Sequence, residues 1–244
     1  AVHTKDTIFG LKPTGNAVLP FNRTPLTNAG TVSNRSIVTV RVPGSGEIQL
    51  YIRKDGIYAF NGVDSIKISG RLDGDRYWGS INTSRLSKSF AIAYEQKNEV
   101  WFYVPYGTTQ TTMNHIIVYD YLRGIFYPPW DAGLNSSITS AGLVDNVPVS
   151  GDEADGFLYK HEDGLNDTDG TTVKAINSYF KTAASPAMGQ DVMLRWLFVR
   201  NSFDILGNYE VSITYSSPGI VGVTTTINQG GGFDAIGSFV IGES

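Results

Sequence analysis

Between Glu99 and Trp130 the chain carries two dense runs of β-branched and aromatic residues, and this stretch constrains the fold more than any other. The first run, Glu-Val-Trp-Phe-Tyr-Val, ends at Val104, and the second starts at His115 after a polar loop. Such runs, interrupted by Gly and Pro, are typical of paired strands rather than helices. Because no polar residue alternates between Val100 and Val104, we expect that strand to be covered on both faces. The stretch therefore predicts an antiparallel β-meander.

A succession of four short strands occurs twice in the sequence and returns a third time in weaker form. Asp55-Gly56 and Asn61-Gly62 are strong hairpin-turn signals in the first copy. Four-stranded units that repeat every 40 to 60 residues or so are typical of the blades of a β-propeller. We therefore predict an all-β fold of antiparallel four-stranded units, arranged as a complete or partial propeller. The expected strands are 36–40, 48–52, 56–60 and 65–69, then 89–94, 99–104, 114–119 and 124–127, then 137–141, 147–149, 156–160 and 173–180.

The remaining segments suggest three regions. Residues 1–35 are rich in Asn, Thr, Pro and Gly, and we interpret them as an extended N-terminal arm that lies on a neighbouring surface. Residues 36–182 hold the blades, with one helical turn expected at 80–87 in the linker between the first two. Residues 183–244 again contain alternating strand patterns, which indicate either a further blade or a small sandwich.

Composition excludes several classes of protein and of site. With no Cys, the chain has no disulfide framework, no thiolate zinc site and no thiol nucleophile. A net charge of −4 disfavours a surface that grips nucleic acid, which would need clustered Lys and Arg. No apolar run approaches the roughly 20 residues of a membrane-spanning helix, so we expect no membrane partner.

Two acidic, Gly-containing loops are the only metal-like features. The second, around Asp163, Asp167 and Asp169, contains an Asp-x-Asp-Gly phrase, and calcium prefers such oxygen-rich turns. It lacks the alternating carboxylates and the closing Glu of an EF-hand loop. Asp, Asn and Gly also occupy ordinary turns for backbone reasons, and we favour that interpretation. We therefore predict no cofactor.

The His and aromatic side chains are the candidates for catalytic and stacking roles. The three His residues have no metal-ligand spacing and belong to no recognisable nucleophile–base pattern, so we expect no enzyme. Trp78, Tyr106 and Trp130 are candidates for a platform that stacks on sugars or bases. Strand context explains most such rings as core instead. We expect Trp101 in particular to be inter-blade core, together with Tyr119 and Phe126.

Two phrases carry a resemblance to a known family. They are Asp55-Gly-Ile-Tyr-Ala-Phe-Asn-Gly62 and Val118-Tyr-Asp-Tyr-Leu-Arg-Gly124, each beside the strands described above. With them the chain resembles the β-propeller tail proteins of tailed bacteriophages, of the nozzle, stopper or head-to-tail stabilisation type. The likeness covers roughly residues 35–215 and concerns fold more than activity.

The resemblance implies a structural virion protein without an active site. Such a protein assembles with copies of itself into a ring, usually hexameric, and contacts other tail and adaptor proteins. Genome DNA passes through the ring without specific binding, which suits a mildly acidic chain. A carbohydrate-binding propeller or adhesin is the alternative, and a propeller hydrolase with two carboxylates across a cleft is the third hypothesis. The number of blades, the ring size and the partner proteins stay open.

Overall fold

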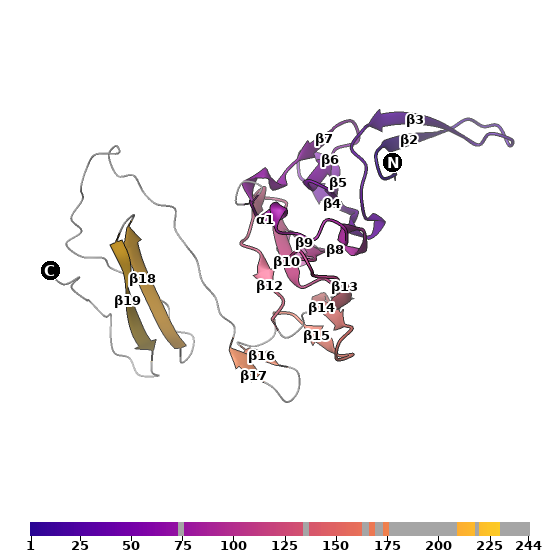
Figure 1. Ribbon diagram of the computed structural model, residues 1–244. Coiled ribbons are helices and arrows are strands. Elements are labelled where there is room, and N and C mark those ends of the chain that lie inside the picture. The colour runs from indigo at the N-terminus through magenta and orange to yellow at the C-terminus, as the bar shows by residue number, and fades with distance from the viewer. Residues whose placement is uncertain are drawn as a thin grey trace, which may run out of the picture. The chain divides into compact units, whose positions relative to one another are not determined.

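The computed structural model describes most of the first two thirds of the chain and four strands beyond it. Contacts divide the chain into two compact units, Ala1–Ser178 and Tyr179–Ser244. Every strand pairing in the described parts is antiparallel, which confirms the all-β class (Figure 1). Arrangement as a propeller stays a prediction. The described residues are 1–72, 76–133 and 137–162, and the strands 166–168, 173–175, 209–217 and 220–229.

The first meander forms as the turn signals predict. Its strands are β4 (Val38–Val42), β5 (Gly46–Arg53), β6 (Gly56–Phe60) and β7 (Ser65–Lys67), hydrogen-bonded in chain order. We call them the first sheet. The turn into β6 needs a glycine: Gly56 has φ 155°, and a Cβ there would lie 2.3 Å from the Ser69 hydroxyl oxygen.

The second sheet contains the stretch that dominates the sequence. It consists of β8 (Phe90–Tyr94), β9 (Glu99–Val104), β10 (His115–Asp120) and β11 (Ile125–Phe126), with β12 (Trp130–Asp131) paired to the start of β10. Asn98, in the left-handed conformation (φ 59°), ends the short 3₁₀ turn between β8 and β9.

Strand β9 is the centre of the core, and all six of its residues are buried. Val100, Phe102 and Val104 pack in one apolar cluster with Leu50 and Ile52 of the first sheet. The alternate residues Trp101 and Tyr103 belong to a second cluster, which includes residues of the sheet that follows. The prediction that this strand is covered on both faces is therefore confirmed.

A third sheet follows, with β13 (Ile138–Val144), β14 (Val147–Asp152) and β15 (Leu158–Lys160) in chain order. Ile138 and Ala141 contact the second sheet through the cluster that contains Trp101. The predicted fourth strand was assigned incorrectly. Its described part, β17 (Val173–Ala175), pairs instead with β16 (Asn166–Thr168) in a separate two-stranded sheet.

The N-terminal residues form a sheet rather than an extended segment, which corrects the prediction. Strand β1 (Val2–His3) pairs with β2 (Ile8–Pro13), and β2 pairs with β3 (Phe21–Thr27). Ile8 is fully buried in a cluster with residues of the first sheet, on the face away from the second sheet. From there β2 and β3 project as a narrow ribbon (Figure 1). The polar composition concealed a hairpin whose turn contains Gly15 at φ 73°.

The segment between the first two sheets, residues 68–89, also differs from expectation, and we call it the connector. Its helical turn is α1 (Arg76–Gly79), earlier than predicted, and a 3₁₀ turn follows at Leu86–Lys88. Two further 3₁₀ turns lie at Asn34–Ser36 and Ser69–Arg71. In the second unit the structure describes one hairpin, β18 (Tyr209–Ser217) with β19 (Ile220–Gln229).

Candidate functional site

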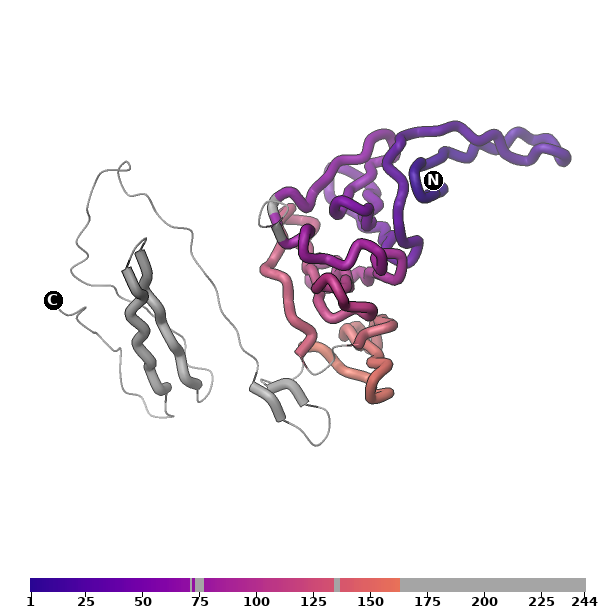
Figure 2. The backbone as a smooth tube through the Cα atoms, viewed as in Figure 1, coloured from indigo at the N-terminus to yellow at the C-terminus, as the bar shows by residue number. Residues whose placement is uncertain are grey.

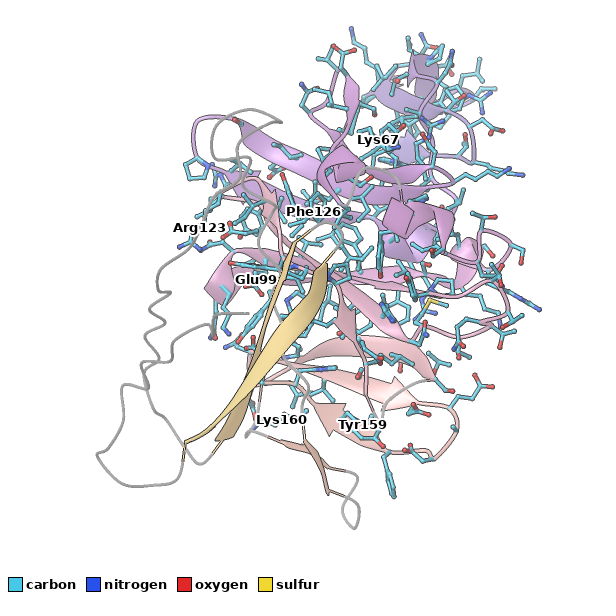
Figure 3. The ribbon with its side chains drawn as sticks, turned by 60° about the vertical axis from the view of Figure 1, so that its left-hand side comes forward. Lys67, Glu99, Arg123, Phe126, Tyr159 and Lys160 are labelled. Carbon is cyan, nitrogen blue, oxygen red and sulfur yellow. The ribbon has the colours of Figure 1, made fainter. Side chains whose placement is uncertain are left out.

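A groove lies beside the connector, at one end of the first sheet. It encloses about 530 Å³, and its lining includes Asp55 and Lys67 of the first sheet with Trp78 and Asn82 of the connector. Figure 3 marks Lys67, whose stem passes over Gly56 so closely that a Cβ there would lie 2.7 Å from its Cε. The groove is thus bounded by the turn into β6 and by the connector.

Two polar side chains of this groove, Asp55 and Asn82, form hydrogen bonds with their own neighbours. Tyr58 donates to Asp55 at 2.7 Å, and burial together with that carboxylate raises the pKa of Tyr58 to about 12. The Asn82 amide donates to the carbonyl of Gln110 at 2.8 Å, and its oxygen accepts from Ser84. The described lining contains no His, no Cys and no second carboxylate. It can hold a small polar molecule, but it lacks the paired groups of a hydrolytic site.

An aromatic stack stands at the junction of the connector and the second sheet. The Tyr106 ring is nearly parallel to those of Tyr77 and His115, with centroids 4.9 and 4.2 Å away. The centroids of Tyr77 and His115 are 6.1 Å apart, so each of the three rings contacts the other two. The Tyr77 hydroxyl and His115 Nδ1 are 3.2 Å apart. Burial raises the pKa of Tyr77, and burial lowers the pKa of His115 against a smaller opposing effect of Asp131. The stack is therefore uncharged at neutral pH, and it joins three segments of the chain.

The predicted stacking residues are not brought together as an open platform. Trp78 is only 7% exposed, and its indole donates to the Lys54 carbonyl at 2.9 Å, which removes it as a candidate. Tyr106 is half-buried and packs against the rings of Tyr77 and His115, so it belongs to this cluster and not to an open platform. Trp130 is 36% exposed and meets the buried Trp101 edge-to-face at 5.0 Å.

The three histidines lie in three different places. His3 bonds Gln49 at 2.8 Å beneath the N-terminal hairpin, and His161 bonds Ser150 at 2.7 Å between the second and third sheets. His115 belongs to the aromatic stack. Within the described residues, no three His, Cys, Asp or Glu side chains come close enough to hold a metal ion.

The acidic loops can be described in part. In the first, Asp152 accepts from the backbone amides of Ser137 and Ala154, and Asp155 accepts from that of Phe157. These carboxylates shape the turn, as Asp does in ordinary Asx turns. In the second loop the weak metal candidates Asp163 and Asp169 lie outside the described residues, and only the backbone of Asp167 is described.

A second groove, of about 360 Å³, is lined by Glu99, Asp120, Arg123 and residues near them. Figure 3 marks Glu99 and Arg123 at this end of the second sheet. Asp120 accepts from the amides of Leu122 and Arg123, so it fixes the turn after β10. Sequence reasoning missed the buried Glu99. Its only signal in the sequence was an acidic residue two positions before Trp101, on the same side of a strand that was expected to be covered on both faces.

Comparison with known proteins assigns the chain to no family. No protein-family model matches it, and the search of curated proteins gives no match. In the described parts of the chain, no helix has both the length and the apolar character needed to cross a membrane.

Proposed function

We propose that the chain is a structural component of a bacteriophage tail, assembled with copies of itself into a ring around the DNA channel. Its place in this proposal is a nozzle or a head-to-tail connector. It acts through contacts with its own copies and with neighbouring tail or adaptor proteins, and it has no catalytic role.

One observation carries the proposal: successive antiparallel meanders share their cores face to face. The first sheet packs on one side of β9 through Phe102, and the third sheet packs on the other side through Trp101 and Ile138. Each sheet is formed by strands in chain order. Face-to-face succession of such units is how propeller blades bury their apolar faces. The same order supports the resemblance on which the tail assignment rests.

The charge and the grooves are compatible with a conduit. Acidic residues outnumber Lys and Arg by 23 to 19, so the chain has no excess of cations to hold phosphates, and DNA is expected to slide past such a wall. In the first groove Asp55 accepts a hydrogen bond from the Tyr58 hydroxyl, and in the second groove Asp120 accepts one from the Leu122 amide. These side chains therefore serve the fold.

A carbohydrate-binding adhesin is the second candidate, and one ring favours it. Trp130 is partly exposed and is held edge-to-face against Trp101, which leaves part of its indole open for stacking on a sugar. Glycan-array binding that is lost in Trp130→Ala and kept in Trp130→Phe would support this candidate. An array without signal would remove it.

Native mass spectrometry tests the tail proposal. The purified chain, measured over a range of concentrations, is expected to give one closed oligomer with a fixed number of subunits. A monomer that persists at the highest concentration would contradict the proposal.

A further inference from the structure

The N-terminal hairpin is anchored at its base and uncovered towards its tip. At the base Ile8 is fully buried against the first sheet. Beyond it five apolar side chains are exposed, and we call residues 11–26 the arm tip. Figure 2 shows this part as the narrow double strand that leaves the other sheets. The exposed side chains are Leu11 (45%), Val18 (85%), Leu19 (67%), Phe21 (55%) and Leu26 (40%).

A two-stranded ribbon of this kind needs a surface to lie on. An isolated hairpin is only marginally stable in water, because each strand buries little without a third layer. Strand β3 is also an edge strand, and six of its seven residues are exposed. Clustered exposed apolar side chains on such an edge mark an interaction site.

The third sheet carries a second uncovered apolar face. Val147, Val149 and Gly151 alternate along β14 and so lie on one face of the sheet. Val144 pairs with Val147, and Leu158 pairs with Gly151, so their side chains lie on the same face. We call this the outer face of the third sheet. Val144 is 58% exposed and Leu158 is 77% exposed. The opposite face, with Ala141, packs on the second sheet.

The two uncovered surfaces have opposite charge. The only charged residues between 7 and 27 are Lys12 and Arg23, which gives the hairpin a formal charge of +2. The segment 144–160, which contains the outer face, has four acids and one Lys, a formal charge of −3. Two of the acids, Asp145 and Glu153, lie in the turns at opposite ends of β14, so they flank the apolar face. Opposite charges around apolar centres favour association and fix its orientation.

The base of the hairpin shows how such a contact is made. Ile8 packs against Tyr51 and Phe60, on the face of the first sheet that the second sheet leaves free. The three sheets stack in the order first, second, third, and within one chain strand β2 therefore covers the outer face of the first sheet. The third sheet is the last of the three, and no described residue covers its outer face in the same way.

We propose that the arm tip of one copy of this chain docks on the outer face of the third sheet of the next copy. The contact joins two different surfaces, so it is head-to-tail, and repetition of such a contact closes into a ring when the rotation allows. The inference rests on the proposed ring and adds the surfaces that join its subunits. Leu19 and Phe21 supply apolar contact with Val144 and Leu158. Arg23, on the same face of the ribbon as Phe21, lies towards the acidic turns, and Lys12 on the other face adds to the positive charge of the arm tip.

Because the chain has no Cys, engineered pairs report this contact directly. The double variant Leu19→Cys with Leu158→Cys is treated with a short bismaleimide at an assembly-competent concentration. We expect a ladder of covalent multimers on a denaturing gel, up to the ring size. Mixing the two single variants should stop at the heterodimer. The matched control pair is Val63→Cys with Leu158→Cys, since Val63 is 68% exposed in another turn; it should cross-link at least about tenfold more slowly.

Charge reversal supplies an independent readout. Lys12→Glu with Arg23→Glu should slow the cross-linking of the Leu19–Leu158 pair severalfold at low salt, and adding Glu153→Lys should recover part of the rate. Circular dichroism of each variant controls for folding. Rings in native mass spectrometry without the ladder would overturn this inference and leave the proposed function standing. A cross-link confined to single chains would show that the outer face is covered in cis and would overturn it too. Absence of any oligomer would contradict both.

Discussion

The indole nitrogen of Trp101 donates to a carboxylate oxygen of Glu99 at 2.8 Å, and both side chains are buried on the face of β9 that meets the third sheet. The donor and the acceptor lie two residues apart on one strand, so they point to the same side. This pair gives a buried carboxyl group a hydrogen-bond donor from the fully buried ring at the contact between two successive meanders. It is the clearest sign that the contact is core rather than surface.

Trp101→Ala should lower the free energy of unfolding by roughly 3–5 kcal/mol, because it removes a fully buried ring and leaves Glu99 without its indole donor. Urea denaturation of the full chain measures this. Glu99→Gln keeps an acceptor oxygen for the indole and should cost much less. A near-neutral Trp101→Ala would mean that this face of β9 meets solvent, and the stacked-blade interpretation would fall with it.

Two buried tyrosines should respond differently to loss of the hydroxyl. The Tyr103 hydroxyl is buried with no hydrogen-bond partner among the described residues, whereas that of Tyr51 bonds the Ala29 carbonyl at 2.5 Å and Ser65 at 2.8 Å. Tyr103→Phe should therefore be neutral or stabilising, and Tyr51→Phe should destabilise by about 1–2 kcal/mol. The midpoints of thermal unfolding compare the pair. The opposite ranking would contradict the described hydrogen bonds.

Gly30→Ala should detach the N-terminal hairpin from the first sheet. A Cβ at Gly30 would lie 2.1 Å from the Thr4 carbonyl oxygen and 2.6 Å from the Thr7 nitrogen, and backbone atoms cannot move aside cheaply. Hydrogen exchange should rise in residues 1–28 more than in β9. Gly142→Ala is the matched control, since nothing lies within 4 Å of a Cβ there. Equal behaviour of the two variants would argue against the close approach.

Stability should fall as the pH drops below about 6.5, the ordinary pKa of His. Burial lowers the pKa of His115 and of His3, so in this range the unfolded chain binds protons that the folded chain does not. The contribution is complete above the unfolded pKa and is lost as the pH falls towards the folded pKa. Thermal unfolding between pH 7.5 and 5 measures it. His115→Phe, which keeps a ring against Tyr106, should flatten the profile, and an unchanged slope would contradict the assignment.

The sequence predicted the strands well and their partners less well. The uninterrupted apolar run from Val100 to Val104 required cover on both faces, and the structure supplies it. Local β-propensity does not specify a partner, however, and Val173–Ala175 pairs with a strand that was not predicted. In the N-terminal arm the hairpin was hidden by a polar composition. Its turn was signalled only by Gly15 and the Asn that follows it.

Site residues were harder to predict than strands, because exposure depends on residues distant in sequence. Trp78 was a candidate for stacking, yet it is buried and bonds Lys54, 24 residues earlier in the chain. Tyr106 packs against Tyr77 and His115, neither of which is its sequence neighbour. No local pattern reveals such contacts. The burial of Trp101 was predictable, since its own strand required it.

Electron cryo-microscopy of the purified full chain tests the central claim most directly. The account predicts class averages of a closed ring with a central channel, in which each subunit contributes consecutive sheets stacked face to face and an N-terminal arm that reaches its neighbour. Single separate subunits at assembly concentrations, or an open filament without a channel, would contradict it.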